Sequence, residues 1–326
     1  MGAYRDPAAE ARAALVARIA AGGELADPAW RAAFEEVPRH LFVPYYFVGR
    51  PGGYERLWGE DPDPRRRARW LEGVYTDIPL ATRLRDGELL SSSSQPSLMA
   101  RMLEVLDVRD GHTVLEIGAG TGYNAALLSH RLGEERVTTV DLEPEITESA
   151  RTHLTAAGFH PAVVTGDGAR GCPSRAPFDR IIATCTLPSV PAGWPAQCTP
   201  GALIEAPLAT GLILLRVRDA GHAEGHFLDT PAYFVPLRGT VPAPEARERG
   251  PLTRPGLENE LFRFLLALTA DSLDPYEAYA LWQREGRPRR ERFGVTVSGE
   301  RQWAWLDDPQ GPHTWPLRDA APKDAP

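Results

Sequence analysis

Three acidic residues and a cluster of glycines have the types and spacing needed to hold a charged organic ligand. Glu116 precedes the segment 118–122, which reads Gly-Ala-Gly-Thr-Gly. Asp141 follows Glu116 by 25 positions, and Asp167 lies between two further glycines. The glycines permit positive φ angles and let a ligand approach the backbone closely. An acid directly before them repels a pyrophosphate but pairs with an ammonium group.

S-adenosylmethionine (SAM) has the matching chemistry, because its amino-acid end is cationic and it carries no phosphate. Under this hypothesis Glu116 faces the ammonium group, Asp141 accepts both ribose hydroxyls and Asp167 meets the adenine amine. Each acid alone can instead be a helix or turn cap, but the common register of all three favours the ligand. The expected cofactor residues are Glu116, Gly118, Gly120, Thr121, Gly122, Asp141, Leu142, Asp167 and Gly168.

The elements that must position these residues alternate between short apolar runs and helical segments. Residues 113–117, 137–141 and 162–165 predict strands, and 123–132 and 144–157 have helical periodicity. This alternation predicts an α/β fold with a central, mostly parallel sheet and helices on both faces. The acids then fall at the carboxyl ends of parallel strands, where such sheets bind ligands. The expected fold class is that of a Rossmann-like, class I SAM-dependent methyltransferase.

Six further stretches lie in a characteristic order over about residues 34–217: Val37-Pro-Arg-His-Leu-Phe-Val-Pro44, Tyr75-Thr-Asp77-Ile-Pro79-Leu80, Ser94-Gln95-Pro96, Val114-Leu-Glu-Ile-Gly-Ala-Gly-Thr-Gly-Tyr123, Gly166-Asp-Gly168 and Pro177-Phe-Asp-Arg-Ile-Ile182. Together they resemble the protein L-isoaspartate O-methyltransferases. The first stretch is rather specific to that family, whereas the glycine motif alone indicates only a class I methyltransferase. The resemblance implies esterification of a peptide carboxylate with SAM as the cofactor.

The family's Thr-Ile-Ser-x-Pro active-site loop is represented here by Ser92-Ser93-Ser94-Gln95-Pro96. By the resemblance, Ser94 matches the serine that faces the substrate carboxylate; a flexible loop is the alternative for a serine run. Free Asp titrates near about pH 4, so the nucleophile is already ionised and no general base is required. The expected catalytic residues are Ser92, Ser93 and Ser94, and the expected substrate-binding residues are Asp77, Pro79, Ser91 and Gln95.

Two segments depart from the compact repair enzymes of that family, an exposed insertion at 50–70 and an added segment at 241–326. Both resemble members that methylate an aspartate in modified ribosomal peptides, after which the ester closes to a succinimide (aspartimide). We therefore favour a macrocyclic or otherwise modified precursor peptide as the substrate, with general isoaspartyl repair as the alternative. A non-catalytic SAM-fold adaptor is an alternative from another class, and the intact glycines and acids argue against it.

The chain is expected to have three parts: a helical N-terminal segment at 1–75, a SAM-binding domain at 76–228, and a linker with a small C-terminal substrate-selecting module at 229–326. Asp27 and the proline after it predict the start of a second N-terminal helix. Prolines in 241–256 suggest a linker, and two glycines argue for a loop at 221–226. Trp303 and Trp305 of the module can either contact the peptide or form a small core.

Composition excludes several other classes of protein. The formal charge of −8 disfavours a nucleic-acid partner, which demands clustered Lys and Arg. No apolar run approaches the roughly 20 residues of a membrane span, and the first residues lack a signal peptide's apolar stretch. The three cysteines form no Cys-x-x-Cys pair, and His222 and His226 lack a third ligand, so no metal site is expected. We expect a cytoplasmic monomer with no membrane partner.

Overall fold

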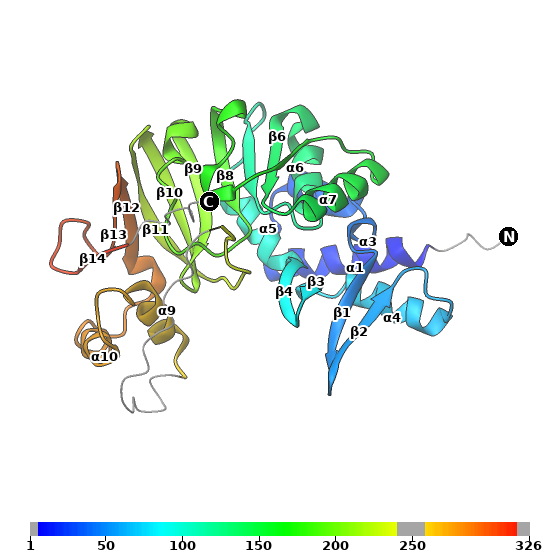
Figure 1. Ribbon diagram of the computed structural model, residues 1–326, viewed down its shortest axis with the longest axis horizontal. Helices are drawn as coiled ribbons and strands as arrows, with labels where there is room; N and C mark the ends of the chain where they lie inside the picture. Colours follow the sequence, from blue (N-terminus) through cyan, green and yellow to red (C-terminus); the bar gives the residue numbers. More distant parts are fainter. Residues whose placement is uncertain (1–5, 240–257, 318–326) are drawn as a thin grey trace. The chain divides into compact units, whose positions relative to one another are not determined.

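The computed structural model describes residues 6–239 and 258–317. The chain divides into two compact units, Met1–Gly166 and Asp167–Pro326, whose elements are labelled in Figure 1. This boundary differs from those expected at residues 75 and 228, which remain predictions about domains.

Several helices begin with the same pair of residues, an aspartate followed by a proline. The pairs begin α1 (Pro7–Gly22), α2 (Pro28–Glu36) and α4 (Pro64–Val74) in the first unit and α10 (Pro275–Arg284) in the second. In each pair the aspartate side chain accepts a hydrogen bond from the first turn, and proline at the first helical position has no N–H to lose. The predicted helix start at Asp27 is confirmed.

The first unit contains a four-stranded antiparallel sheet in the order β2-β1-β3-β4. Its strands are β1 (Tyr45–Arg50), β2 (Gly53–Trp58), β3 (Leu80–Arg85) and β4 (Glu88–Ser93). The expected exposed insertion at 50–70 therefore includes the second strand of a hairpin and most of α4. Leu57 is buried, and Asp61 accepts hydrogen bonds from Trp58 and Arg66. The polar composition of this stretch reflects ion pairs, not a lack of structure.

The first unit also contains three parallel strands in the order β5-β6-β7. They are β5 (Val114–Ile117), β6 (Val137–Asp141) and β7 (Ala162–Thr165), connected by α6 (Tyr123–Leu132) and α7 (Pro144–Ala156). Two shorter stretches, α3 (Arg39–Phe42) and α5 (Pro96–Val105), flank the four-stranded sheet in sequence. The predicted strands and helices of this part are confirmed to within a residue or two.

The second unit contains seven strands in the order β8 to β14. Only β8 and β9 are parallel, and every later pair is antiparallel. The strands are β8 (Phe178–Ala183), β9 (Cys198–Leu208), β10 (Gly211–Asp219), β11 (His222–Pro231), β12 (Phe293–Ser298), β13 (Arg301–Leu306) and β14 (Thr314–Pro316). The α/β fold is confirmed, and its strands are mixed in direction, not mostly parallel.

One expectation for the second unit needs correction. Of the expected loop at 221–226, only Gly221 lies in a turn, and residues 222–226 lie on β11. A Cβ atom at Gly225 would lie 1.9 Å from Leu214 O, so the close approach of β10 requires this glycine. Strand β12 pairs with β11, so the C-terminal strands extend the same sheet. The expected C-terminal module remains a prediction. Helix α9 (Glu260–Leu268) packs on these strands through Phe264. The expected linker at 241–256 lies entirely outside the described residues.

Within the described ranges 6–239 and 258–317, no helix is both long enough and apolar enough to cross a bilayer. No group of three or more His, Cys, Asp or Glu side chains in these ranges is arranged to hold a metal ion.

Candidate functional site

The glycine segment forms the turn between β5 and α6. Gly118, Gly120 and Gly122 have φ angles of 103°, 51° and 85°, which residues with a Cβ atom rarely adopt. Two N–H groups of the turn reach β6: that of Gly118 donates to Val140 O (2.8 Å) and that of Gly120 to Asp141 Oδ2 (3.3 Å). The turn therefore fixes the carboxyl ends of β5 and β6 together, as a ligand site across both strands requires.

Gly122 allows a test of how tightly this turn is packed. A Cβ atom there would lie 3.2 Å from Ala150 O and 3.2 Å from Leu154 Cγ. We expect Gly122→Ala to lower the free energy of unfolding by about 2 kcal/mol, with about half of the loss due to the positive φ alone. Gly158→Ala is the matched control, because Gly158 has a φ of 82° and open space around its Cβ position. Urea unfolding of both variants measures the difference, and equal losses would contradict the packing argument.

Glu116 lies on β5 and is only 1% exposed. Its Oε1 accepts a hydrogen bond from Asn124 Nδ2 (2.8 Å). Among the described residues, its Oε2 has no hydrogen-bond partner, and neither has Asn124 Oδ1. The pKa of the Glu116 carboxyl is raised to about 7, mainly by burial and to a smaller extent by the charge of Asp141. Thr139 and Asn124 act in the opposite direction.

These unpartnered oxygens fit the amino-acid end of SAM. A buried acceptor without a donor is unfavourable by about 1–3 kcal/mol, and an ammonium group supplies three N–H donors. Asp141 lies on the neighbouring strand β6, two positions after Thr139, the residue that pairs with Glu116. Asp141 is buried, and Leu142 after it is half-buried. Glu116 and Asn124 thus fit the charged end of the cofactor, and the contact of Asp141 with its ribose remains a prediction.

Asp167 and Gly168 belong to the second unit. The Asp167 carboxylate accepts a hydrogen bond from Ala169 N (2.9 Å) and caps a short 3₁₀ turn at Gly168–Arg170. This is the cap that the sequence left open as the alternative for each acid. A contact of Asp167 with adenine remains a prediction.

Arg39 is a buried cation that joins the two segments carrying the expected substrate residues. Its side chain is fully buried, and burial lowers its pKa to about 10, while Tyr123, Asp77 and Tyr75 act in the opposite direction. It is therefore charged at neutral pH, yet within the described residues no carboxylate forms an ion pair with it. Its guanidinium donates to five oxygens: Val74 O (2.6 Å), Thr76 O (3.3 Å), Ile78 O (3.4 Å), Ser93 Oγ (3.2 Å) and Ser94 O (3.1 Å).

The four serines differ in what their hydroxyl groups contact. Ser91 is buried and accepts from Thr82 Oγ1 (3.3 Å), and Ser93 is buried and accepts from Arg39. Ser92 and Ser94 are half-buried, and within the part of the chain that the structure describes their hydroxyls have no recorded partner. Ser91 and Ser93 accept these bonds within the protein, whereas the hydroxyls of Ser92 and Ser94 keep both their donor and their acceptor capacity for a ligand. The expected contact of Ser93 with substrate does not fit its burial, and Ser93 is better described as the link to Arg39.

Strand β4 carries Ser91, Ser92 and Ser93 and is called the serine strand below. It lies directly beside the glycine turn. A Cβ atom at Gly120 would lie 3.6 Å from Ser92 O and 3.8 Å from Ser91 Oγ. A single added carbon at Gly120 would thus reach ordinary van der Waals contact with β4, so the two segments are separated by little more than one atom. The structure therefore brings together the expected catalytic residues and the expected cofactor turn, which are far apart in sequence.

Two of the remaining expected substrate residues, Asp77 and Gln95, make hydrogen-bond contacts at the start of α5. Asp77 Oδ1 accepts from Ser97 N (2.8 Å), and Gln95 Nε2 lies 3.4 Å from Asp77 Oδ2. Pro79 is exposed, as is Ile78 beside it. Asp77 and Gln95 thus hold segment 76–79 against the serine strand, and Pro79 is available at the surface.

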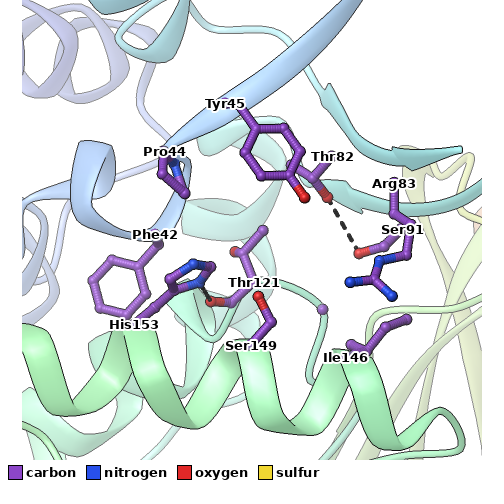
Figure 2. A pocket seen from close by; sticks show the side chains of 11 residues that line it. Phe42, Pro44, Tyr45, Thr82, Arg83, Ser91, Thr121, Ile146, Ser149 and His153 are labelled. Carbon is purple, nitrogen blue, oxygen red and sulfur yellow. Dashed lines mark hydrogen bonds between the residues drawn. The ribbon is translucent and has the colours of Figure 1, made fainter. Parts of the chain in front are cut away.

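Figure 2 shows a pocket in the first unit, with α7 below and the four-stranded sheet above. Tyr45, Thr82, Arg83 and Ser91 line its upper side. Its other lining residues are Phe42, Pro44, Gly120, Thr121, Ile146, Ser149 and His153. The pocket therefore adjoins both the glycine turn and the serine strand.

His153 fixes the position of the glycine turn from the α7 side. Its Nδ1 lies 3.0 Å from Thr121 O, and because a carbonyl only accepts, Nδ1 carries the proton. Burial lowers the pKa of His153, and the hydrogen bond to Thr121 partly opposes this. The imidazole is therefore neutral at physiological pH, with Nδ1 protonated.

Trp303 and Trp305 lie in the second unit and differ in exposure. Trp305 is 2% exposed, and its Nε1 donates to Thr296 Oγ1 (3.0 Å). Trp303 is half-buried, and its Nε1 donates to Pro309 O (3.0 Å). Trp305 is thus a core residue, the alternative that the sequence had left open, and only Trp303 has surface available to a peptide.

Arg39, His153 and Thr82 were not among the residues selected from the sequence. Arg39 had a signal, a charged residue inside the apolar Val37–Pro44 stretch that was itself singled out. His153 and Thr82 had none, because a histidine in an amphipathic helix and a threonine in a strand are ordinary surface residues. Their roles depend on tertiary contacts alone.

A glycine turn after a strand, a buried acid before it and a second acid on the next strand define a SAM-dependent methyltransferase of class I. A family model described as protein-L-isoaspartate(D-aspartate) O-methyltransferase matches residues 66–240. The chain therefore belongs to this family of carboxyl methyltransferases, which use SAM as methyl donor.

Named relatives agree with this assignment. The protein-L-isoaspartate O-methyltransferase of Hyperthermus butylicus is 33% identical over 71% of this chain and 89% of its own length. That of Azorhizobium caulinodans is 35% identical over 71% of this chain and 94% of its own length.

Solved structures show the same fold. A protein-L-isoaspartate O-methyltransferase structure matches 88% of this chain and 96% of its own, with a TM-score of 0.61 and 25% identity. A Plasmodium falciparum structure described as an enzyme of this type, in complex with S-adenosyl-L-homocysteine, covers 72% of this chain and 99% of its own, with a TM-score of 0.54. At 12% identity it is a likeness of fold alone.

Proposed function

We propose that this protein transfers a methyl group from SAM to the carboxylate of isoaspartyl residues in proteins or peptides. The observation that carries the proposal is the contact of the serine strand, anchored by Arg39, with the glycine turn that follows Glu116. The segment proposed to hold the carboxylate and the segment proposed to hold the cofactor therefore lie beside each other, with Ser91 and Gly120 lining one pocket. The names of the relatives support the same substrate class.

Each residue's proposed role follows from its contacts. Glu116 pairs with the ammonium group and Asp141 with the ribose hydroxyls of the cofactor. The hydroxyls of Ser92 and Ser94 hold the substrate carboxylate, and Arg39 keeps the strand that carries them in place. The charge of Arg39, which forms no ion pair among the described residues, also favours an anion nearby.

The chemistry demands positioning more than proton transfer. SAM, when bound, supplies an activated methyl group on a sulfonium. A carboxylate is ionised at neutral pH, with a free pKa near about 4, so the chain needs no general base. What its residues supply is alignment of one carboxylate oxygen with the methyl group while hydroxyls hold the other oxygen. The methyl ester is then open to attack by the following backbone nitrogen, which expels methanol and gives a succinimide.

An aspartate in a modified ribosomal peptide was the substrate favoured on sequence grounds, and it remains the second hypothesis. The comparisons support isoaspartate better. The structural match covers 88% of this chain, whereas residues 1–240 are less than three quarters of it, so that match includes part of the C-terminal segment. A C-terminal extension is therefore compatible with an isoaspartate methyltransferase. The expected monomeric state and cytoplasmic location likewise stay predictions.

The test uses two matched peptides that differ only in Asp-Gly or isoAsp-Gly, each incubated with the full chain and SAM. We expect mass spectrometry to show methyl gain on the isoAsp peptide and none on the Asp peptide. The opposite selectivity would favour the aspartate-modifying hypothesis. Methylation of neither peptide, with S-adenosyl-L-homocysteine binding confirmed by calorimetry, would contradict general repair activity.

A further inference from the structure

The pocket of Figure 2 has the composition of an anion site. Arg83 contributes a guanidinium, and Tyr45, Thr82, Ser91, Thr121 and Ser149 contribute hydroxyl groups. Among the described residues that line the pocket, none is a carboxylate. Arginine and hydroxyl donors are the groups with which proteins bind carboxylates.

Arg83 has donors to spare for such a ligand. Its side chain is 27% exposed and lies on β3, where its Nη1 pairs with Oε2 of Glu145 at the start of α7. Glu145 is itself 71% exposed. A guanidinium has five N–H donors, and among the described residues Glu145 is its one recorded partner. Arg83 is therefore poised to take a second carboxylate in the pocket or to exchange Glu145 for it.

The pocket continues away from the glycine turn. Tyr45, Thr82 and Arg83 also line a second, more open hollow. The other walls of this hollow are Phe47, Leu84, Arg85, Leu90 and Glu145. A site for the cofactor alone would end at the glycine turn, whereas two hollows joined along β1, β3 and β4 fit a peptide chain.

The position of the pocket along β4 limits which part of a peptide reaches it. Ser91 lines the pocket, and Ser92, proposed to hold the methyl-accepting carboxylate, is the next residue. Successive residues of a strand are about 3.4 Å apart. The side chains of Ser91 and Ser92 point to opposite faces of β4, but the two residues are adjacent, so we expect a group in the pocket to belong to a near neighbour of the modified residue.

We propose that the pocket around Arg83 is a specificity subsite for a second carboxylate, that of an acidic residue beside the methyl-accepting residue. This inference rests on the proposed function and adds a substrate class to it, peptides in which an acidic residue flanks the isoaspartate. Tyr45, held between Phe47 and Arg56 by ring and cation–π contacts, forms the wall that closes the subsite from the β1 side.

The test compares isoAsp peptides that carry Glu or Gln immediately before or after the modified residue. We expect the Glu peptide of one pair to have a kcat/KM about tenfold above its Gln partner, as one charge-assisted hydrogen bond predicts. Arg83→Gln should bring this ratio close to one. Arg109→Gln is the control for net charge, because Arg109 is 71% exposed and lines neither hollow.

Glu145→Gln separates recognition from a structural role. It frees the guanidinium from its competitor, so the ratio should rise, whereas Arg83→Gln lowers it. If the ion pair only stabilised the fold, both variants would change activity in the same direction and leave the ratio unchanged. That result, or a wild-type ratio of one for both peptide pairs, would overturn the proposal.

Two further outcomes separate this inference from its alternatives. If Arg83→Gln weakens binding of S-adenosyl-L-homocysteine in calorimetry, the carboxylate belongs to the cofactor and the subsite proposal fails. If no peptide is methylated, the proposed function fails by itself. In that case the subsite is tested by binding alone. Calorimetry with S-adenosyl-L-homocysteine present measures the dissociation constants of the same Glu and Gln peptides, and their ratio replaces the ratio of kcat/KM.

Discussion

Arg39→Met is expected to lower kcat/KM for an isoAsp peptide by about a hundredfold, while the affinity for S-adenosyl-L-homocysteine stays within about twofold. The guanidinium connects segment 74–78 to Ser93 and Ser94, and its removal leaves those carbonyls without a donor. The serine hydroxyls then lose their fixed distance from the glycine turn. Misplacement by about 1 Å is enough for a hundredfold loss in rate.

The variant Arg39→Lys shows whether geometry or charge matters more. Lysine keeps the positive charge but has three donors on one nitrogen, so it cannot reach five acceptors on two segments. We expect it to recover folding stability but little of the kcat/KM. Steady-state kinetics measure the catalytic effect and urea unfolding the stability. Full activity of either variant, or an equal loss of cofactor affinity, would contradict the positioning role.

Glu116→Gln is expected to weaken cofactor binding by about a hundredfold, because it removes the buried charge opposite the ammonium group. The wild-type protein should show a matching pH dependence. Burial raises the pKa of Glu116 to about 7, so below that pH the carboxyl is protonated and cannot pair with a cation. The affinity for S-adenosyl-L-homocysteine should therefore fall about tenfold from pH 8 to pH 6.

The sign of the stability effect follows from the same pKa. In the ligand-free protein a raised carboxyl pKa favours folding at low pH, and this contribution disappears as the pH rises through about 7. The bound ammonium group compensates the charge, so the ligand should raise the unfolding temperature more at pH 8 than at pH 6. Calorimetry and thermal unfolding at both pH values test this. A pH-independent affinity, or the same pH dependence in Glu116→Gln, would contradict the assignment.

The cofactor half of the site was predictable because its signals are local. Strands at 137–141 and 162–165 and the helix at 123–132 follow from periodicity, and the glycines are required by positive φ angles in one turn. The position of Asp141 beside the turn then follows from parallel pairing.

The substrate half and the second unit were less predictable because their determinants are tertiary. Ser93 and Ser94 are adjacent and identical in type, and only the position of Arg39 gives their hydroxyls different roles. Gly225 resembles a loop residue in sequence, yet it is required by the close approach of a neighbouring strand. Trp305 fits a peptide contact as well as a core until its burial is known.

The most direct test of the account is to locate the transferred methyl group. The full chain is incubated with an isoAsp-Gly peptide and SAM that carries an isotope-labelled methyl group. Tandem mass spectrometry then identifies the chemical group of the peptide to which the labelled methyl is attached. We expect the label on the free carboxylate of the isoaspartyl residue, with a strong decrease in Arg39→Met and none in Gly158→Ala. A label on a nitrogen, on another carboxylate of the peptide, or on none of its atoms would contradict it.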